Sequence, residues 1–237
     1  MLHYETVSSE LLITLKKIIA DPWFSSFRLA GGTALALKHG HRESIDIDLF
    51  SDRSFDNQEI IAVLANLFEA SSFIVTKENK IGVSAIANEV KIDLLCWRDI
   101  FFDPVEYIDG IPFFSDREIF AMKLAAIADR AARKDFIDLF LLLDQYTLKE
   151  GLSFYKMKYP FMDIINVLTG LKNYSRADTE EKPKMVRFKD IQWEAIKVKI
   201  EFCIDQYFLQ AESEKQNSIK QRDERLRLLI EQREKSE

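Results

Sequence analysis

The feature that most constrains the fold is a six-residue segment, 45–50, in which apolar and acidic residues alternate as Ile-Asp-Ile-Asp-Leu-Phe. Alternation with a period of two predicts a β-strand that carries the carboxylates of Asp46 and Asp48 on one face of a sheet. The intervening side chains are then expected to face the core: Ile45, Ile47 and Leu49. Two neighbouring carboxylates repel each other unless a cation or a shared proton lies between them, so the segment predicts a sheet with a site on one face.

A glycine pair precedes this segment. Residues 27–30 have the pattern of a short strand, Gly31-Gly32 interrupt it, and residues 33–38 have the pattern of one or two helical turns. Glycines at such a junction allow another group to approach the backbone closely, and the free N–H groups of a helix start attract phosphate. Thr33 adds a hydroxyl there, either as a phosphate ligand or as an ordinary N-cap of the helix. A glycine pair alone more often marks an ordinary turn.

A third carboxylate, Asp93, lies in residues 90–96, which alternate in the same way. If the two strands are neighbours, Asp46, Asp48 and Asp93 converge on one face of the sheet. Mg²⁺ binds carboxylate oxygens and also phosphate oxygens, so this layout suits phosphoryl transfer with two metal ions. The alternative for an isolated Asp-x-Asp pair is a strand end or a solvent-facing pair, although the apolar neighbours make that arrangement costly here.

The rest of the chain divides into a mixed front half and a helical back half. We expect a helix over 11–19, a helix over 58–70 capped by Asp56, an antiparallel meander over 73–77, 81–87 and 90–96, and a short strand at 113–114. From Asp116, taken as a cap, we expect helices over 116–131, 134–146, 152–159, 162–168 and 191–209, then a charged terminal helix. The predicted fold class is therefore α+β, with a small mixed sheet flanked by helices in residues 1–115 and a helical domain, the other wall of a cleft, in residues 116–237.

Composition excludes several classes of protein. With a formal net charge of −6 over 237 residues, the chain as a whole is not a basic nucleic-acid binder. No apolar run reaches about 18 residues, and the N-terminus has no basic region before an apolar stretch, so we expect no spanning helix, no membrane partner and no signal peptide. Cys96 and Cys203 lack metal-ligand spacing and are expected as buried free thiols, which is typical of a cytoplasmic protein.

Residues 153–189 mix basic and aromatic side chains. The basic residues are Lys156, Lys158, Lys172, Arg176, Lys182, Lys184 and Arg187, and the aromatic ones are Tyr155, Tyr159, Phe161 and Tyr174. Such a mixture suits an RNA backbone with unstacked bases, but an ordinary solvated helix pair has the same composition and is the simpler interpretation.

Two stretches together resemble one known family. They are Gly-Gly-Thr-Ala-Leu-Ala-Leu at 31–37 and His-Arg-Glu-Ser-Ile-Asp-Ile-Asp-Leu-Phe at 41–50. The pattern resembles the AbiEii/AbiGii toxin family of nucleotidyltransferases, in the polymerase-beta-like superfamily. Its signature is a Gly-Gly or Gly-Ser pair, a short gap, Asp-x-Asp and a third acidic residue on a later strand, which Asp93 matches. Family members often carry serine where this chain has Gly32, but Gly-Gly-Thr is also common in this branch.

A second block, on two successive predicted helices, strengthens the resemblance. The family pattern of a lysine followed by Lys-Asp-x-x-Asp-Leu is matched by Lys123 and by residues 134–139. The resemblance implies functional importance for Lys123 and Asp135, with Asp138 close behind. Lys123 and Arg130 are seven residues apart, so they share one helix face and could both reach a triphosphate. The alternative is a pair of exposed helices that carry surface charges.

The expected activity is that of a nucleotidyltransferase, which moves a nucleoside monophosphate from an NTP to an acceptor hydroxyl and releases pyrophosphate. Asp46 and Asp48 are expected to hold two Mg²⁺ ions, and Asp93 to bind the ion nearer the acceptor. The expected nucleotide-binding residues are Gly31, Gly32, Thr33, Arg42, Ser44, Lys123 and Arg130. The resemblance implies a bacterial toxin–antitoxin or phage-defence system, with a cognate antitoxin protein as partner and tRNA as acceptor.

Two other functions stay open. One keeps the fold and changes the substrate, which would make the chain a small-molecule or protein nucleotidyltransferase. The other is a non-catalytic nucleotide-binding or interaction module. The presence of Asp46, Asp48 and Asp93 argues against a module that has lost catalytic activity.

Overall fold

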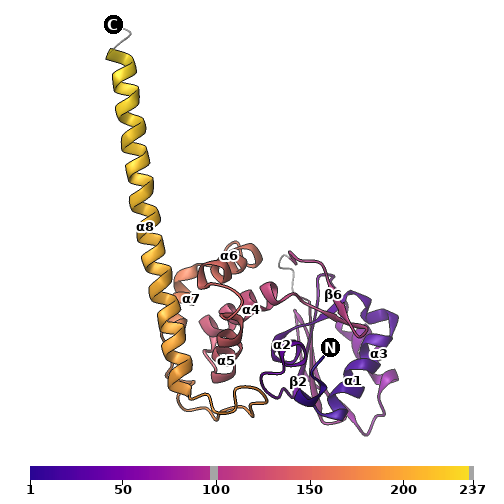
Figure 1. The fold of residues 1–237 in the computed structure, drawn as a ribbon. Helices are drawn as coiled ribbons and strands as arrows, with labels where there is room; N and C mark the ends of the chain where they lie inside the picture. Colours follow the sequence, from indigo (N-terminus) through magenta and orange to yellow (C-terminus); the bar gives the residue numbers. More distant parts are fainter. Residues whose placement is uncertain (97–100, 235–237) are drawn as a thin grey trace.

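The computed structural model describes residues 1–96 and 101–234. Its front half is built on one seven-stranded mixed sheet with the strand order β3-β4-β5-β2-β1-β7-β6 (Figure 1). The strands are β1 (Phe27–Leu29), β2 (Asp46–Ser51), β3 (Phe73–Asn79), β4 (Gly82–Ala87), β5 (Val90–Cys96), β6 (Glu106–Ile108) and β7 (Ile111–Phe113). With the helices described below, this confirms the predicted α+β class.

The middle of the sheet is β2, whose inward side chains Ile47 and Leu49 are fully buried. It pairs in parallel with β5 and antiparallel with β1. Strands β3, β4 and β5 form the predicted antiparallel meander. The turn between β4 and β5 uses Asn88 and Glu89, both with positive φ, as a two-residue hairpin turn requires. The short strand expected at 113–114 is β7, which forms a hairpin with β6 that the sequence analysis missed.

Three helices accompany the sheet. They are α1 (Ser9–Ala20), α2 (Gly31–His39) and α3 (Asn57–Leu67), with short 3₁₀ turns at Tyr4–Thr6 and Pro22–Ser26. Helices α1 and α3 contact each other and the sheet, whereas α2 contacts β2 on one side and helices of the back half on the other. Asp56 caps α3 as predicted, since its carboxylate accepts hydrogen bonds from the N–H groups of Gln58 and Glu59.

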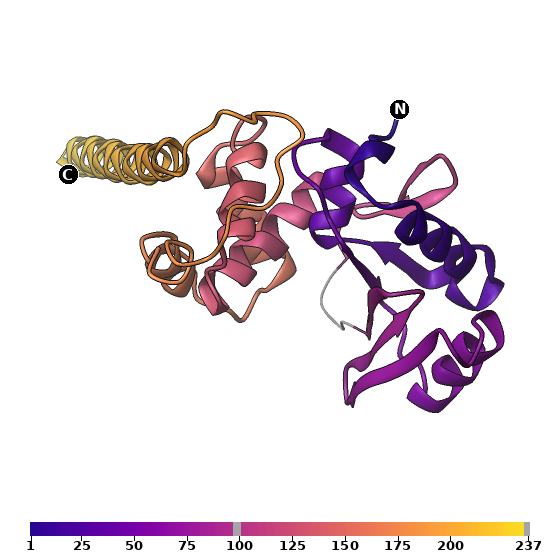
Figure 2. The ribbon, with the colours of Figure 1, turned by 90° about the horizontal axis from the view of Figure 1, so that it is seen from below.

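The back half is helical, as expected, and lies beside α2 (Figures 1 and 2). Its helices are α4 (Asp116–Asp129), α5 (Arg133–Leu142), α6 (Leu148–Lys158), α7 (Ile164–Leu171) and α8 (Trp193–Glu234). The cap of α4 is Ser115, whose hydroxyl accepts from the N–H of Glu118, and not Asp116 as predicted. The boundary that we propose near residue 115 falls between β7 and α4.

The last helix, α8, is much longer than the helix expected over 191–209. Its 42 residues correspond to a length of roughly 63 Å, and Figure 1 shows it extending far beyond the rest of the molecule. All residues from 211 to 225 are exposed. The expectation of a charged, solvated terminal helix therefore holds over 211–225, while residues 235–237 lie outside the described part of the chain.

Two expectations from composition can be compared with the structure. Among the residues that the structure describes, no helix is both long enough and apolar enough to cross a membrane. Cys96 and Cys203 are free thiols, as expected, but both are half-buried rather than buried.

Three details of the predicted segments at 27–38 and 45–50 differ in the structure. Ile45 is 76% exposed instead of facing the core, because β2 begins only at Asp46. Gly31 and Gly32 are the first two residues of α2 rather than a turn before it. Thr33 therefore lies inside the helix and is not its N-cap.

The core of the back half depends on the packing of α4 against α6. Phe120 of α4 is fully buried and lies edge-on to Phe154 of α6. A Cβ atom added to Gly151 of α6 would lie 2.5 Å from the ring of Phe120, so the glycine lets the two helices approach closely. Phe120 therefore fills space that no neighbouring side chain can reach without a backbone shift.

We predict that Phe120→Ala lowers the free energy of unfolding by about 3–5 kcal/mol, because it removes a buried ring and leaves a cavity. The control Ile13→Ala replaces a side chain that is exposed on α1 and should change stability by less than about 0.5 kcal/mol. Urea unfolding followed by circular dichroism measures both. Equal effects of the two substitutions would contradict this account of the core.

Candidate active site

The three aspartates lie on neighbouring strands. In the parallel pairing of β2 and β5, Asp48 is opposite Asp93, and Asp46 is opposite Lys91. The condition set by the sequence, that the two strands must be neighbours, is therefore met. Since residues paired across adjacent strands share a face, the three carboxylates and Lys91 belong to one surface of the sheet.

The charge of Asp48 is poorly compensated. Burial raises the pKa of its carboxyl above the usual range, and the nearby carboxylates of Asp93 and Asp46 raise it further. The other two aspartates each face a lysine: Lys91 Nζ lies 2.6 Å from Asp93 Oδ2, and Lys134 Nζ lies 3.6 Å from Asp46 Oδ2. A cation bound between these carboxylates would relieve the repulsion that raises the pKa of Asp48.

The donor chemistry and the strand register therefore fit hard divalent cations. The side-chain positions are not yet those of a closed metal site. Within residues 1–96 and 101–234, no group of three or more His, Cys, Asp or Glu side chains is gathered closely enough to hold a metal ion. Cation binding at this surface would thus require Asp93 and Asp46 to leave their lysine partners.

The start of α2 adjoins Asp48 because Gly31 has no side chain. A Cβ atom at Gly31 would lie 2.2 Å from Asp48 Oδ2, and the φ of +68° also favours glycine. The backbone reinforces this placement, since the N–H of Ala30 donates to the carbonyl of Asp48 at 2.9 Å. Ala30 is the N-cap of α2 and, among the described residues, no side chain caps this helix start. Its first N–H groups are therefore suited to an anionic ligand.

The second glycine accommodates Arg42. A Cβ atom at Gly32 would lie 2.1 Å from Arg42 Nη2. The Arg42 side chain is buried and donates from Nε and Nη2 to the two carboxylate oxygens of Asp138, at 2.7 and 2.8 Å. Arg42, which we predicted to bind nucleotide, is thus engaged with α5 in this structure.

Three side chains contact the carboxylate of Asp138. Besides Arg42, it lies 2.6 Å from Lys123 Nζ and 2.7 Å from His41 Nε2. Burial opposes ionisation of Asp138, but Arg42 and Lys123 outweigh it and hold the pKa of the carboxyl well below its usual range. Burial lowers the pKa of His41 despite Asp138, so its imidazole is neutral at pH 7. The Nδ1 atom of His41 finds no hydrogen-bond partner in the described chain.

Lys123 and Arg130 meet at Asp135. Lys123 Nζ lies 3.1 Å from Asp135 Oδ1, and the Arg130 guanidinium donates to both carboxylate oxygens at 2.9 and 3.0 Å. Burial opposes the charge of Lys123, but Asp138 and Asp135 raise the pKa of its ammonium, so it stays protonated. Lys123 and Arg130 are therefore both paired with a carboxylate of α5. Their contact with a triphosphate stays a prediction.

Thr33 and Ser44 organise the start of β2. The hydroxyl of Thr33 lies 2.8 Å from Ser44 Oγ and also within hydrogen-bonding distance of the carbonyl of Asp46. The N–H of Ser44 donates to the carbonyl of Thr6 at 2.9 Å. Both side chains are buried, so in this structure they set the position of Asp46 rather than face a ligand.

A segment of the back half returns to the front half and holds the residues before β2. Met185 forms an antiparallel bridge with Arg42, and the N–H of Val186 donates to the carbonyl of His41 at 3.0 Å. The guanidinium of Arg187 donates to the carbonyl of His39 at 2.9 Å. Figure 2 shows this segment passing beside α2 before α8 begins. We call residues 184–187 the strap; no spacing in the sequence indicated it.

Other side chains are engaged elsewhere in the fold. His39 hydrogen-bonds Asp116, away from Asp138, and neither His39 nor His41 belongs to a metal cluster among the described residues. In the basic and aromatic stretch, Lys158 is buried against Glu118. Tyr155 and Tyr159 are buried too. These three side chains are therefore not available to an RNA surface. The other basic residues of the stretch are exposed, so both interpretations of it stay predictions: Lys156, Lys172, Arg176, Lys182, Lys184 and Arg187.

We predict that Asp138→Asn lowers the free energy of unfolding by about 3–5 kcal/mol, because it leaves the buried charges of Arg42 and Lys123 without their anion. The control Asp205→Asn changes an exposed carboxylate of α8 and should be close to neutral. Chemical denaturation measures both, and a neutral Asp138→Asn would show that the buried charges have other partners.

The pKa shifts also predict how stability depends on pH. The folded-state pKa of Asp138 lies below its ordinary 3.8, so its stabilisation is present above pH 3.8 and is lost as the pH falls below that value. The folded-state pKa of His41 lies below its ordinary 6.5, so its contribution is present above pH 6.5 and declines as the pH falls through the folded value. We expect His41→Gln to flatten the decline in unfolding free energy between pH 7 and 5. An unchanged slope in denaturation at several pH values would contradict this.

Comparisons with known proteins match most of this chain. A family model described as "Nucleotidyl transferase AbiEii toxin, Type IV TA system" matches residues 13–207. An uncharacterized protein from Aquifex aeolicus (strain VF5) is 30% identical over 190 residues, which cover 77% of this chain and 88% of that protein.

Solved structures show the same fold at low sequence identity. MenT4, a nucleotidyltransferase toxin from Mycobacterium tuberculosis H37Rv, is 15% identical with a TM-score of 0.53, over 84% of this chain and 86% of that one. JHP933 from Helicobacter pylori is 17% identical with a TM-score of 0.50, over 89% of this chain and 95% of that one. The family resemblance noted in the sequence is thus confirmed: this chain belongs to the AbiEii family of nucleotidyltransferase toxins.

Proposed function

We propose that this chain transfers a nucleoside monophosphate from an NTP to an acceptor hydroxyl in a Mg²⁺-dependent reaction. The acceptor oxygen forms the new bond to the α-phosphorus, and the bond from that phosphorus to the bridging oxygen of pyrophosphate breaks. The hydroxyl proton passes to a carboxylate of the site, and pyrophosphate leaves. The family carries the class of reaction, and the arrangement of Asp48, Asp93 and Gly31 supports its assignment to this surface.

Each residue has a distinct part in the proposal. Asp46, Asp48 and Asp93 are the ligands for Mg²⁺, which when bound supplies positive charge to the phosphates and to the attacking oxygen. Asp93, on the strand farther from α2, is the carboxylate nearer the acceptor and takes its proton. Gly31 keeps the start of α2 open, so that its N–H groups bind a phosphate oxygen.

The residues of the second block act on the triphosphate side. The side chain of Arg130 is half-exposed, and we assign it to contact with a phosphate of the nucleotide. Lys123 adds positive charge near the aspartates, since it lies close enough to Asp48 to lower the pKa of that carboxyl. Asp135 orients both cations through the contacts described above. We infer that Arg42 and Asp138 hold this arrangement together rather than touch the nucleotide.

The biological setting is also part of the proposal. The family description names a type IV toxin–antitoxin system. We infer that the chain is a cytoplasmic toxin of such a system, that a cognate antitoxin opposes it, and that it acts in defence against phage with tRNA as acceptor. The net charge of −6 means that any RNA contact would depend on a local surface rather than on the whole protein.

We predict that Asp48→Asn lowers the rate of nucleotide transfer by at least about 100-fold, because a ligand of the metal and a charge in the transition state are lost. It should leave stability unchanged or raise it, since burial already opposes the charge of Asp48. The control Asp52→Asn changes an exposed carboxylate just after β2 and should leave the rate unchanged. The assay follows labelled NTP in the presence of Mg²⁺, with EDTA as a metal-free arm.

The acceptor is tested with the same label. Each of the four NTPs is incubated with the protein and either total tRNA, total cellular protein or a small-molecule extract. Label on tRNA that Asp48→Asn abolishes supports the proposal. Label on protein or on a small molecule would replace tRNA as the acceptor, and transfer that persists in Asp48→Asn would contradict the assigned site.

A further inference from the structure

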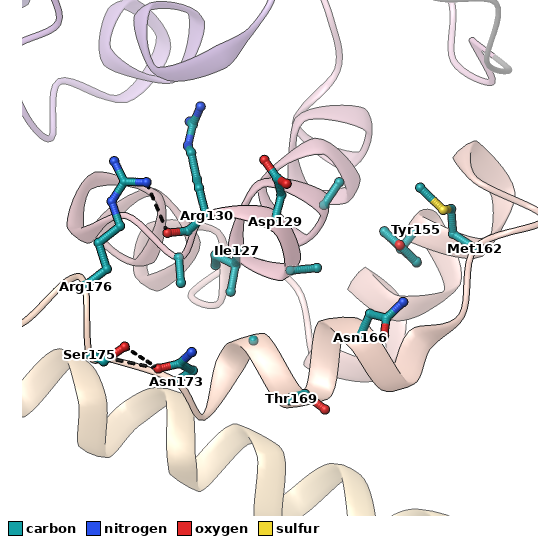
Figure 3. A pocket seen from close by; sticks show the side chains of 14 residues that line it. Ile127, Asp129, Arg130, Tyr155, Met162, Asn166, Thr169, Asn173, Ser175 and Arg176 are labelled. Atoms are coloured by element: carbon teal, nitrogen blue, oxygen red, sulfur yellow. Dashed lines mark hydrogen bonds between the residues drawn. The ribbon is translucent and has the colours of Figure 1, made fainter.

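A groove with a volume of about 420 Å³ lies between the end of α4, the helix α7 and the turn that follows α7. Its floor is made of small residues, because Ala125, Ala128 and Gly170 leave the space open. A Cβ atom at Gly170 would lie 2.7 Å from the carbonyl oxygen of Ile127, so α7 is held tightly against α4 at one end of the groove. Figure 3 shows the side chains that line it.

The walls of this groove carry neutral polar groups. Asn166, Thr169, Asn173 and Ser175 are exposed and line it. Asn173 Oδ1 accepts hydrogen bonds from the N–H and the hydroxyl of Ser175, which leaves the amide nitrogen of Asn173 as a donor. Side-chain amides both donate and accept hydrogen bonds, which is the property that recognition of a nucleobase edge requires.

The electrostatics of the groove favour an uncharged ligand portion. Arg176 is already paired with Glu180, with Nε 2.7 Å from its carboxylate. Asp129 adds a carboxylate to the lining, and Arg130 directs its guanidinium away from the groove to Asp135 (Figure 3). A phosphodiester backbone would meet Asp129 without a free cation to offset it. A neutral base with its ribose fits better.

The groove begins where the candidate active site ends. Arg130 belongs to both, since its backbone carbonyl faces Arg176 in the groove while its guanidinium binds Asp135. Lys134, in the first turn of α5 after Arg130, lies 3.6 Å from Asp46. The groove is therefore connected to the Asp46 end of the site through Arg130, Ala131 and the start of α5.

From this placement we propose that the groove binds the base and ribose of the incoming NTP, with Asn166 and Asn173 reading the base edge. This inference rests on the proposed function, because it takes Asp46 and the start of α2 as the phosphate end of the nucleotide. A volume of about 420 Å³ is within the range of small-ligand sites, which spans roughly 300–1,000 Å³. The α4–α7 groove thereby becomes the part of the molecule that selects among the four NTPs.

The test fills the groove from its exposed rim. Thr169→Phe places a ring in the groove, and the matched control Ile165→Phe places one on the same helix at a position that is 63% exposed and does not line the groove. Binding of each Mg-NTP and of Mg-tripolyphosphate to the full chain is measured by calorimetry. Tripolyphosphate has no nucleoside, so it reports on the phosphate end alone.

We expect Thr169→Phe to weaken NTP binding by at least tenfold, which corresponds to about 1.4 kcal/mol, and to leave tripolyphosphate binding unchanged. Ile165→Phe should change neither. A second variant, Asn166→Leu, is conservative in size at an exposed position and should reduce the preference among the four NTPs. The Asn166→Leu variant still tests the inference if Thr169→Phe prevents the chain from folding.

Other outcomes overturn the inference in distinguishable ways. Unchanged NTP affinity in Thr169→Phe and an unchanged base preference in Asn166→Leu would exclude the groove as the nucleoside site while the proposed function stands. If those variants also lost transfer to the acceptor, the groove would be the acceptor's site instead. A wild-type chain that bound neither NTP nor tripolyphosphate would overturn the proposed function together with this inference.

Discussion

The fully buried carboxylate of Asp138 is a central contact between the two halves of this molecule. It receives Arg42 and His41 from the segment before β2 and Lys123 from α4. Arg42, held there, occupies the space that a side chain at position 32 would need, so Gly32 must be a glycine. The adjacent Gly31 lies against Asp48, so the surface that we assign to catalysis and the ion pair of Arg42 with Asp138 meet at the start of α2. A buried pair of this kind is costly to break, and it specifies one arrangement of the two halves.

The local elements were largely predictable, because their signals lie within a few neighbouring residues. The alternation at 45–50 and 90–96 located two strands, and Asp56 marked a helix start. That the two strands are neighbours was only a condition in the sequence and is seen in their pairing. Alternation defines which residues share a face but not where a strand begins. Ile45 is exposed for this reason, since the bond from the N–H of Ser44 to the carbonyl of Thr6 delays the strand to Asp46. Lys91 could have been found, because it is two residues from Asp93 and so shares its face.

The partners of the charged residues could not be predicted, because they depend on contacts between distant segments. The sequence placed Lys123 and Asp135 on two successive helices, which was right, whereas Arg130 is the C-cap of the first helix and lies just outside it. Nothing in their spacing indicated that Lys123 would bind two aspartates, or that Arg42 would turn away from the nucleotide toward α5. The strap at 184–187 was missed for the same reason. Its bridge to Arg42 joins residues without a shared pattern, in a stretch whose composition suggested an RNA surface or a solvated helix pair.

The bond between Arg42 and Asp138 spans 96 positions in the chain, and this has a consequence for timing during synthesis. The segment with Asp46 and Asp48 leaves the ribosome long before α5, and longer still before the strap. Contacts of such long range form late and slow the folding of a domain. Until residue 138 has been added, Arg42 lacks the anion that positions it and α2 lacks its final support. The order of the elements along the chain thus means that this contact between the two halves can form only after residue 138 has been added.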